Sequence, residues 1–163
     1  MGMPLSPPDV REASIQPARA EDLTAILDLL VRCGLPIEGM GQDPVRFLVA
    51  RSPAPSGAGA VLGCVGLEIH GSSCLLRSFA VTPAVRGHGL ALRLIRASLE
   101  KARAAGCAHA YLLTLTVERL ALRHGFHRVT REEVPPSVLA SREFSLTTCA
   151  PAAVMHLPLT SPD

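Results

Sequence analysis

The sequence predicts a mixed α/β layer fold in a single domain. Its 163 residues are 48% apolar and 18% charged, which is typical of a chain that buries its own core. Apolar residues recur with the period of a helix in two segments, whereas runs typical of strands fill residues 60–70 and 74–81. Because helical and strand segments are interleaved without a repeat, we expect one layered domain over residues 13–159.

The individual elements follow from these periods and from the glycines and prolines that interrupt them. Apolar residues at i, i+3, i+4 and i+7 predict a helix over residues 23–30, which Gly34 ends. A longer helix over residues 89–105 has one apolar and one charged face, and Gly106 is its expected C-terminal cap. A short third helix covers residues 117–124. Strands are expected at residues 15–19, 47–50, 60–70, 74–81, 108–114, 126–130 and 153–157.

The two ends and the cysteines carry further expectations. Residues 1–12 are rich in proline and polar groups and predict a flexible arm. The apolar segment 150–159 is a candidate for pairing across a homodimer. No apolar run approaches the roughly 18 residues that a membrane span needs, so no membrane partner is expected. The five cysteines form no CxxC pair, which predicts free thiols in a reducing cytoplasm.

Charge and aromatic content argue against a nucleic-acid partner. The net charge of +2 comes from 16 basic and 14 acidic side chains, too even a balance for a protein that binds a phosphate backbone. Aromatic residues are only 3% of the chain, with no tryptophan and with Tyr111 as the one tyrosine, so base-stacking platforms are not expected. A small-molecule partner is therefore expected.

The most informative segment is VTPAVRGHGLA, at residues 81–91. A predicted strand leads through a proline-containing loop into a glycine-bearing turn that opens the long helix. The unpaired N–H groups of such a helix start, beside the positive end of its dipole, form a site for a phosphate or pyrophosphate. Gly87 and Gly89 let the backbone approach the ligand, and Arg86 adds a positive charge. The phosphate loop of nucleotide hydrolases would need a lysine here, and the dinucleotide fingerprint would need a glycine in place of Leu92.

The pattern Val-x-Pro-x-x-Arg-Gly-x-Gly at 81–89, the helix after it and the later Gly125–Phe126 pair resemble the GCN5-related N-acetyltransferase (GNAT) superfamily. The resemblance spans about residues 13–159 and implies a mostly antiparallel central sheet, splayed at the cofactor site and flanked by helices. It also implies acetyl-CoA as co-substrate. No metal is expected, because His124 and His127 straddle Gly125 and have no third ligand nearby in the sequence. On this resemblance the main chain of Phe79, Ala80 and Val81 pairs with the pantetheine arm. The N–H groups that would hold the pyrophosphate belong to Arg86, Gly87, His88, Gly89, Leu90 and Ala91.

Within the superfamily, several stretches are similar to the ArsN2-type acetyltransferases associated with arsenic-resistance operons. They are residues 34–36, 63–68, 75–78, 112–114 and 133–144. This resemblance implies a genomic context more than a substrate. It also makes Cys64 and Cys74, which fall on the two strands of the predicted hairpin, candidate arsenic ligands if they are neighbours. The alternative for both cysteines is core packing.

Acetyl transfer to an amine needs a base, and an acid helps the thiolate to leave. Glu68, near the end of its strand, is the candidate general base if burial raises its pKa, and the alternative is a carboxylate that is solvated or paired with an arginine. His70, on the same strand face, is a second candidate base. The tyrosine that many family members use as acid corresponds to Ala121. The resemblance therefore supplies no general acid, and the departing thiolate is expected to take its proton from water.

Arg77 is a candidate clamp for a substrate carboxylate. It stands two positions before Phe79 and is expected to share its face of the strand. The alternative is a structural ion pair with Glu68 or another acid. The leading hypothesis is an acetyl-CoA-dependent N-acetyltransferase that acts on a small, amino-acid-like amine by direct transfer in a ternary complex. A non-catalytic sensor that binds acyl-CoA or an arsenical is the alternative.

Overall fold

The computed structural model describes residues 10–40, 45–53, 59–114, 117–145 and 152–159. Its strands are β1 (Ser14–Pro17), β2 (Arg46–Arg51), β3 (Val61–His70), β4 (Ser73–Val81), β5 (His109–Thr114), β6 (His127–Val129) and β7 (Ala153–Pro158). They form a sheet of order β1-β2-β3-β4-β5-β7-β6 in which β4 and β5 are parallel and the other described pairs are antiparallel. The predicted mixed, mostly antiparallel α/β fold is confirmed.

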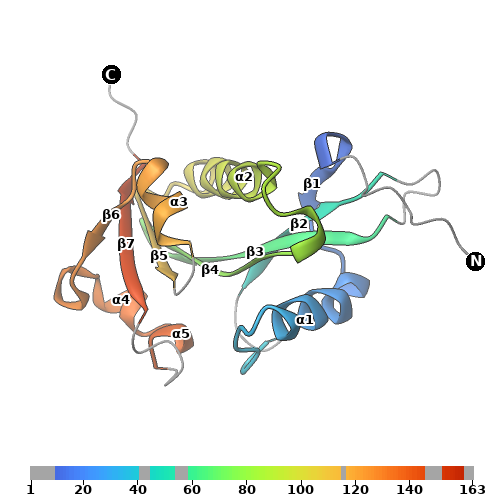
Figure 1. Ribbon diagram of the computed structural model, residues 1–163. Helices are drawn as coiled ribbons and strands as arrows, with labels where there is room; N and C mark the ends of the chain where they lie inside the picture. The colour runs from blue at the N-terminus through green and yellow to red at the C-terminus, as the bar shows by residue number, and fades with distance from the viewer. Residues whose placement is uncertain (1–9, 41–44, 54–58, 115–116, 146–151, 160–163) are drawn as a thin grey trace, which may run out of the picture.

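Helices cover both faces of this sheet (Figure 1). The α-helices are α1 (Leu23–Arg32), α2 (Leu90–Ala104), α3 (Glu118–Arg123), α4 (Pro136–Leu139) and α5 (Arg142–Ser145). Four 3-10 turns accompany them: η1 (Val10–Glu12), η2 (Ala20–Asp22), η3 (Pro83–Val85) and η4 (Arg131–Glu133). In Figure 1, α2 and α3 lie on one face, and α1, α4 and α5 lie on the other.

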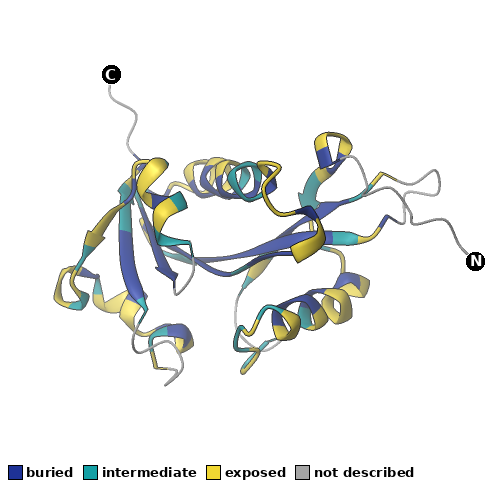
Figure 2. Cartoon of the chain, in the orientation of Figure 1, coloured by how far each residue is buried: buried dark blue, intermediate teal, exposed yellow. Residues whose placement is uncertain are grey.

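The core follows from this layering, because each helix turns its apolar stripe to the sheet. Figure 2 shows the buried residues along the central strands and on the sheet-facing sides of the helices. The main cluster joins α2 to the strands, and a second cluster joins α1 to β2, β3 and β4. A third cluster lies under α4, between β5 and β7. The second and third clusters lie on the face that carries α1, α4 and α5. Between them the charged side chains of Glu68, Arg77 and Glu143 are buried.

The parallel pairing of β4 with β5 is short, and this shapes the site. It runs from Ser73 opposite His109 to Leu76 opposite Leu112. Beyond Leu76, β4 keeps its pairing with β3, whereas β5 keeps its pairing with β7. The two strands therefore separate, and the edge of β4 that faced β5 has no strand partner among the described residues over its last part.

A β-bulge interrupts β4 at the same place. Gly66 pairs with Arg77 and Cys64 pairs with Ala80, so one extra residue stands on β4 between them. Ser78, within the bulge, has a φ of +52°. The bulge breaks the alternation of side chains along the strand. The expectation that Arg77 and Phe79 share a face is therefore wrong: Phe79 packs against the main core, while Arg77 reaches α5 on the opposite face.

The chain ends differ in detail from their expectations. Most of the arm expected over residues 1–12 lies outside the described residues, but its last three residues form η1, in which Val10 is buried. β1 ends at Pro17 because the chain then turns into η2. β7 lies between β5 and β6, so its central residues have no free edge for a strand of a second copy, and the homodimer stays a prediction. None of the helices in the described ranges has the length and apolarity of a membrane span.

Candidate active site

A cavity of about 320 Å³ lies beside the part of β4 that has separated from β5. The second half of β4, the turn before α2, the start of α2 and the end of α1 form its walls. Of the nine residues predicted to bind the cofactor, eight line this cavity, and His88 does not. The eight are Phe79, Ala80, Val81, Arg86, Gly87, Gly89, Leu90 and Ala91.

The turn before α2 has the backbone geometry that an anion site requires. Gly87 and Gly89 have φ values of +85° and +81°, a region that residues with a Cβ rarely occupy. Gly89 is the N-terminal cap of α2, and no side chain caps this helix start among the described residues. The first N–H groups of α2 are therefore available to a ligand beside the positive end of the helix dipole.

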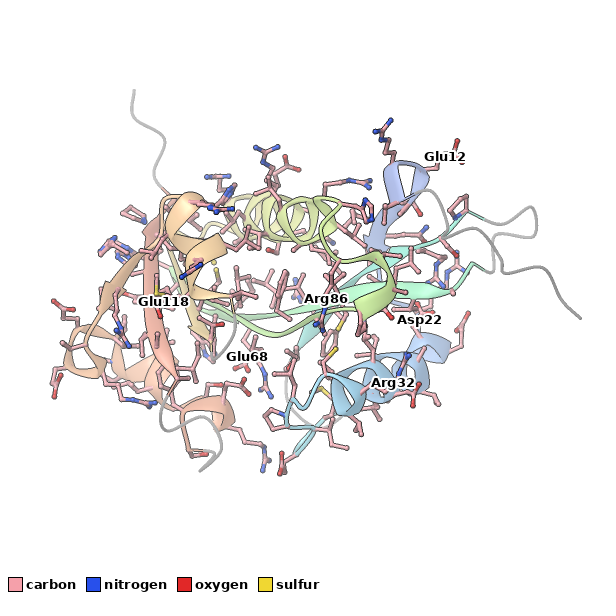
Figure 3. The ribbon with its side chains drawn as sticks, in the orientation of Figure 1. Glu12, Asp22, Arg32, Glu68, Arg86 and Glu118 are labelled. Atoms are coloured by element: carbon pink, nitrogen blue, oxygen red, sulfur yellow. The ribbon has the colours of Figure 1, made fainter. Side chains whose placement is uncertain are left out.

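Arg86 closes one side of this turn (Figure 3). Its Nε donates to the carbonyl oxygen of Val81 at 3.0 Å, and its Nη2 donates to Sγ of Cys33 at 3.4 Å. The guanidinium thus joins the end of β4 to the end of α1 and stays at the wall of the cavity. It adds a positive charge where the helix start already favours an anion.

On the face of the sheet that carries α1 and α5 (Figure 1), Glu68 and Arg77 form a buried ion pair. Arg77 Nη1 donates to Glu68 Oε2 at 2.7 Å, and both side chains are nearly inaccessible, at 1% and 3% exposure. Ser141 Oγ donates to the same oxygen at 3.0 Å, and His70 Nε2 lies 2.9 Å from Glu68 Oε1. The predicted common face of Glu68 and His70 is confirmed by this contact.

A second carboxylate completes the surroundings of Arg77. Glu143, from α5, places its Oε2 at 2.9 Å from Arg77 Nη2. Nε of the same guanidinium donates to Ser78 Oγ at 3.3 Å, so all three arginine nitrogens have partners. This arrangement corresponds to the ion-pair alternative for Arg77 rather than to a substrate clamp. It also corresponds to the alternative for Glu68, a carboxylate paired with an arginine, so that its role as base stays a proposal. Glu143 and Ser141 were not among the predicted site residues, and the one signal for them in the sequence is that a buried arginine requires an acid.

The hydroxyl groups near the predicted acid position, on Tyr111 and Thr114, belong to residues that do not line the cavity. Ala121 is fully buried in the main core, and the residue of this segment that lines the cavity is Val117. Thr114 Oγ1 accepts the N–H of Val117 at 2.8 Å and so starts α3. Tyr111 packs under α4 and stacks on His156, and burial raises its pKa.

The cysteines do not form the neighbouring pair that the hairpin suggested. Cys64 stands opposite Ala80, whereas Cys74 stands opposite Ile69 near the other end of the same strand pair. Both belong to apolar clusters, and burial raises the pKa of each thiol to about 12. The condition for joint arsenic ligation, that the two cysteines are neighbours, is not met, and the alternative of core packing describes them. The described residues contain no group of three or more His, Cys, Asp or Glu side chains arranged to hold a metal ion.

Comparison with known proteins agrees with this architecture. The acetyltransferase (GNAT) family model matches residues 28–129, more than half of the chain. The splayed sheet, with the uncapped start of α2 beside β4, therefore belongs to an acetyltransferase fold. The chain is a member of the GNAT acetyltransferase family. No curated protein matches it.

Solved structures share the fold at low sequence identity. N-acetylglutamate synthase from Neisseria gonorrhoeae, complexed with coenzyme A and L-arginine, has a TM-score of 0.72 at 18% identity over 91% of this chain. The chain spans only 34% of that enzyme's length. Rv2747 from Mycobacterium tuberculosis, in complex with CoA and NLQ, has a TM-score of 0.70 at 24% identity, covering 90% of this chain and 99% of that one. A GNAT acetyltransferase from Staphylococcus aureus has a TM-score of 0.74 at 11% identity, covering 91% and 99%.

Proposed function

We propose that the protein is an acetyl-CoA-dependent N-acetyltransferase that acts on a small, amino-acid-like amine by direct transfer in a ternary complex. The observation that carries the proposal is the cavity between the free edge of β4 and the uncapped start of α2. Family membership supports the acetyltransferase class. Two of the solved structures that share the fold are complexes with coenzyme A, which supports the choice of co-substrate.

The residues present fit acetyl-CoA, which would supply the activated acetyl group. In the proposal the N–H groups of residues 86–91 hold the pyrophosphate, because the positive φ values of Gly87 and Gly89 bend the chain around an anion. The main chain of residues 79–81 binds the pantetheine amides. Its N–H and C=O groups lie on the strand beyond the last parallel pair with β5, at Leu76. In the proposal the pantetheine amides take the place of the missing strand partner.

The acceptor is proposed to enter on the face that carries α1, α4 and α5. N-acetylglutamate synthase from the same fold has been solved with N-acetyl-glutamate, which supports an acceptor of amino-acid size. Glu68 stays the candidate base on this face, and half-buried His70, in contact with its Oε1, is proposed as the route by which the proton reaches solvent. Because Ala121 offers no hydroxyl, the thiolate is proposed to take its proton from water.

Two measurements test the function. Saturating acetyl-CoA is expected to raise the Tm, since a ligand that binds the native state stabilises it. A panel of small amines is then assayed for release of free coenzyme A. Turnover that Glu68→Gln abolishes while the Tm rise persists supports the enzyme and its base. Absence of a Tm rise far above micromolar acetyl-CoA overturns the cofactor assignment.

The same assays separate the enzyme from the non-catalytic alternative. Binding of acetyl-CoA without turnover on any amine would identify a sensor. The ArsN2-type resemblance, a cytoplasmic location and a homodimer stay predictions from the sequence. Direct transfer is favoured over a covalent thiol route for two reasons. Cys64 and Cys74 are buried and their thiols have raised pKa values. Cys33 lies at the wall of the cavity, but its hydrogen bonds there are to the carbonyl oxygen of Val81 and to Arg86, neither of which can act as its general base.

A further inference from the structure

The β-bulge in β4 has an unusual conformation that its surroundings must hold in place. Ser78 has a φ of +52°, in the left-handed region that residues other than glycine rarely adopt. Its carbonyl oxygen accepts the Cys64 thiol at 3.3 Å, and its Oγ accepts Nε of Arg77 at 3.3 Å. The bulge directly precedes the strand residues proposed to bind pantetheine, so its position sets theirs.

The direction of Arg77 Nε is fixed by carboxylates on both sides of the guanidinium. Glu68, on β3, holds Nη1 at 2.7 Å, and Glu143, on α5, lies 2.9 Å from Nη2. Because the guanidinium is planar, fixing its two terminal nitrogens also fixes Nε. The arginine is 1% exposed, so water competes little for these contacts.

The helical segment that carries Glu143 is tied to the same group. Ser141 Oγ donates to Glu68 Oε2 at 3.0 Å and accepts the N–H of Glu143 at 3.3 Å. Contacts therefore run without a break from α5, through Arg77, to Ser78. Glu143 does not line the cofactor cavity. Its contacts with Arg77 and Ser141 connect it to the bulge beside that cavity.

We infer that Glu143 is a positioning residue for the cofactor strand. It orients Arg77, which in turn holds the bulge at Ser78 in the conformation that keeps β4 apart from β5. The inference rests on the proposed function, because the ligand of that strand is taken to be acetyl-CoA. It connects α5, on the proposed acceptor face, to the residues of β4 that are proposed to bind the cofactor.

The first test measures acetyl-CoA affinity by titration calorimetry and amide exchange over residues 77–81 by mass spectrometry. Glu143→Ala is expected to weaken binding by about 2- to 30-fold, the range of coupling energies for residues remote from a ligand, and to speed exchange there. Glu143→Gln keeps an acceptor oxygen for Arg77 and is expected to restore most of both. Unchanged affinity and exchange in Glu143→Ala would overturn the inference.

Asp22→Asn provides a matched control. Asp22 forms another buried ion pair, with Arg51 at 2.6 Å, and both side chains are 7% exposed. This pair has no described contact with Ser78. Its loss is expected to lower the Tm as an ion-pair loss does, yet to leave acetyl-CoA affinity unchanged. If Asp22→Asn weakens binding as much as Glu143→Ala, the effect is general destabilisation and the inference is wrong.

Ser78→Ala keeps the test decisive if Glu143→Ala does not fold. It removes the last contact of the chain without leaving a charge unpaired in the core, and is expected to speed exchange over residues 77–81 and weaken acetyl-CoA binding. Unchanged acetyl-CoA affinity and unchanged exchange over residues 77–81 in Ser78→Ala would overturn the inference. If the wild type does not bind acetyl-CoA, the proposed function fails, whereas the exchange data still test the link between α5 and the bulge.

Discussion

Arg86 Nε donates to the carbonyl oxygen of Val81 at 3.0 Å, and this bond joins the last residue of β4 to the turn that precedes α2. The same guanidinium reaches Cys33 at the end of α1. The strand, the turn and the helix end are therefore held together around one cavity by a single charged side chain. A positive charge and the free N–H groups of α2 face the same space, so we expect an anionic ligand to depend on both.

The Arg86→Ala variant is expected to bind acetyl-CoA about tenfold more weakly. Removal of one charged hydrogen-bonding group costs about 1.5 kcal/mol, which corresponds to roughly that factor. Arg86→Lys keeps the charge but lacks the planar fork that contacts Val81 and Cys33, so it is expected to fall between the two. Titration calorimetry measures the three affinities. Equal binding by wild type and Arg86→Ala would remove Arg86 from the cofactor site.

Gly89→Ala is expected to lose both stability and acetyl-CoA affinity. Gly89 has a φ of +81°, and a Cβ there meets nothing within 4 Å, so the cost comes from the backbone conformation and not from a clash. Left-handed residues with a Cβ cost about 1–2 kcal/mol each. A shifted turn would also misalign the first N–H groups of α2. The Tm and the Tm rise with acetyl-CoA measure the two effects.

Gly71→Ala separates these effects. Gly71 has a φ of +63° and an equally open surrounding, but it lies in the turn between β3 and β4, away from the cavity. It is expected to lower the Tm by a similar amount while the acetyl-CoA affinity stays that of the wild type. Loss of affinity in both variants would attribute the Gly89 effect to stability alone.

The regular elements were predictable because their signal is local. The period of apolar residues placed α1 and α2 within two residues of their observed ends, and the glycines after them marked the stops. The turn at residues 86–91 was recognisable for the same reason, since a glycine-rich helix start carries its geometry in consecutive residues. Each of these predictions depends on neighbours in sequence and not on distant contacts.

The buried charges were not predictable in full, because they depend on contacts between distant segments. Glu143 lies in a four-residue helix, too short to show a period, and meets Arg77 only after the sheet and α5 have packed. The bulge at Ser78 is hidden because β4 is buried on both faces, so its sequence shows no alternation that an extra residue would interrupt. That one residue decides which face each later side chain of β4 occupies.

The free energy of unfolding is expected to fall as the pH falls below the ordinary pKa range of histidine, because the pKa of His156 is lowered in the folded protein. Its Nε2 lies 3.0 Å from His109 Nδ1, and its Nδ1 lies 3.4 Å from His127 Nε2. Burial first, and then positive charge on His109 and His127, lower the pKa of His156 from 6.5, which Glu133 partly opposes. The unfolded chain therefore takes up this proton at higher pH than the folded one. The resulting stability is present above about pH 6.5 and is lost as the pH falls through the folded pKa.

Urea unfolding of wild type and His156→Gln at a series of pH values from about 7.5 to 5 measures this dependence. The wild type is expected to lose unfolding free energy more steeply below pH 6.5, because the variant has no proton to take up at this position. His88→Gln, which changes an exposed imidazole outside the cluster, is expected to follow the wild type. Parallel curves for wild type and His156→Gln would contradict the assignment.

Placing a tyrosine at the family's usual acid position is expected to damage this protein and not to improve it. Ala121 has no exposed surface and packs in the main core, whereas Val117 is the residue of this segment that lines the cavity. A phenol at position 121 would overpack the core at a cost of at least about 1–3 kcal/mol. Ala121→Tyr is therefore expected to lower the Tm by several degrees without raising turnover. Leu122→Tyr, at a neighbouring position that is 50% exposed, is the control and is expected to keep the wild-type Tm. A stable Ala121→Tyr variant with faster release of coenzyme A would instead place this position beside the thiol. The introduced phenol would then protonate the thiolate in place of water.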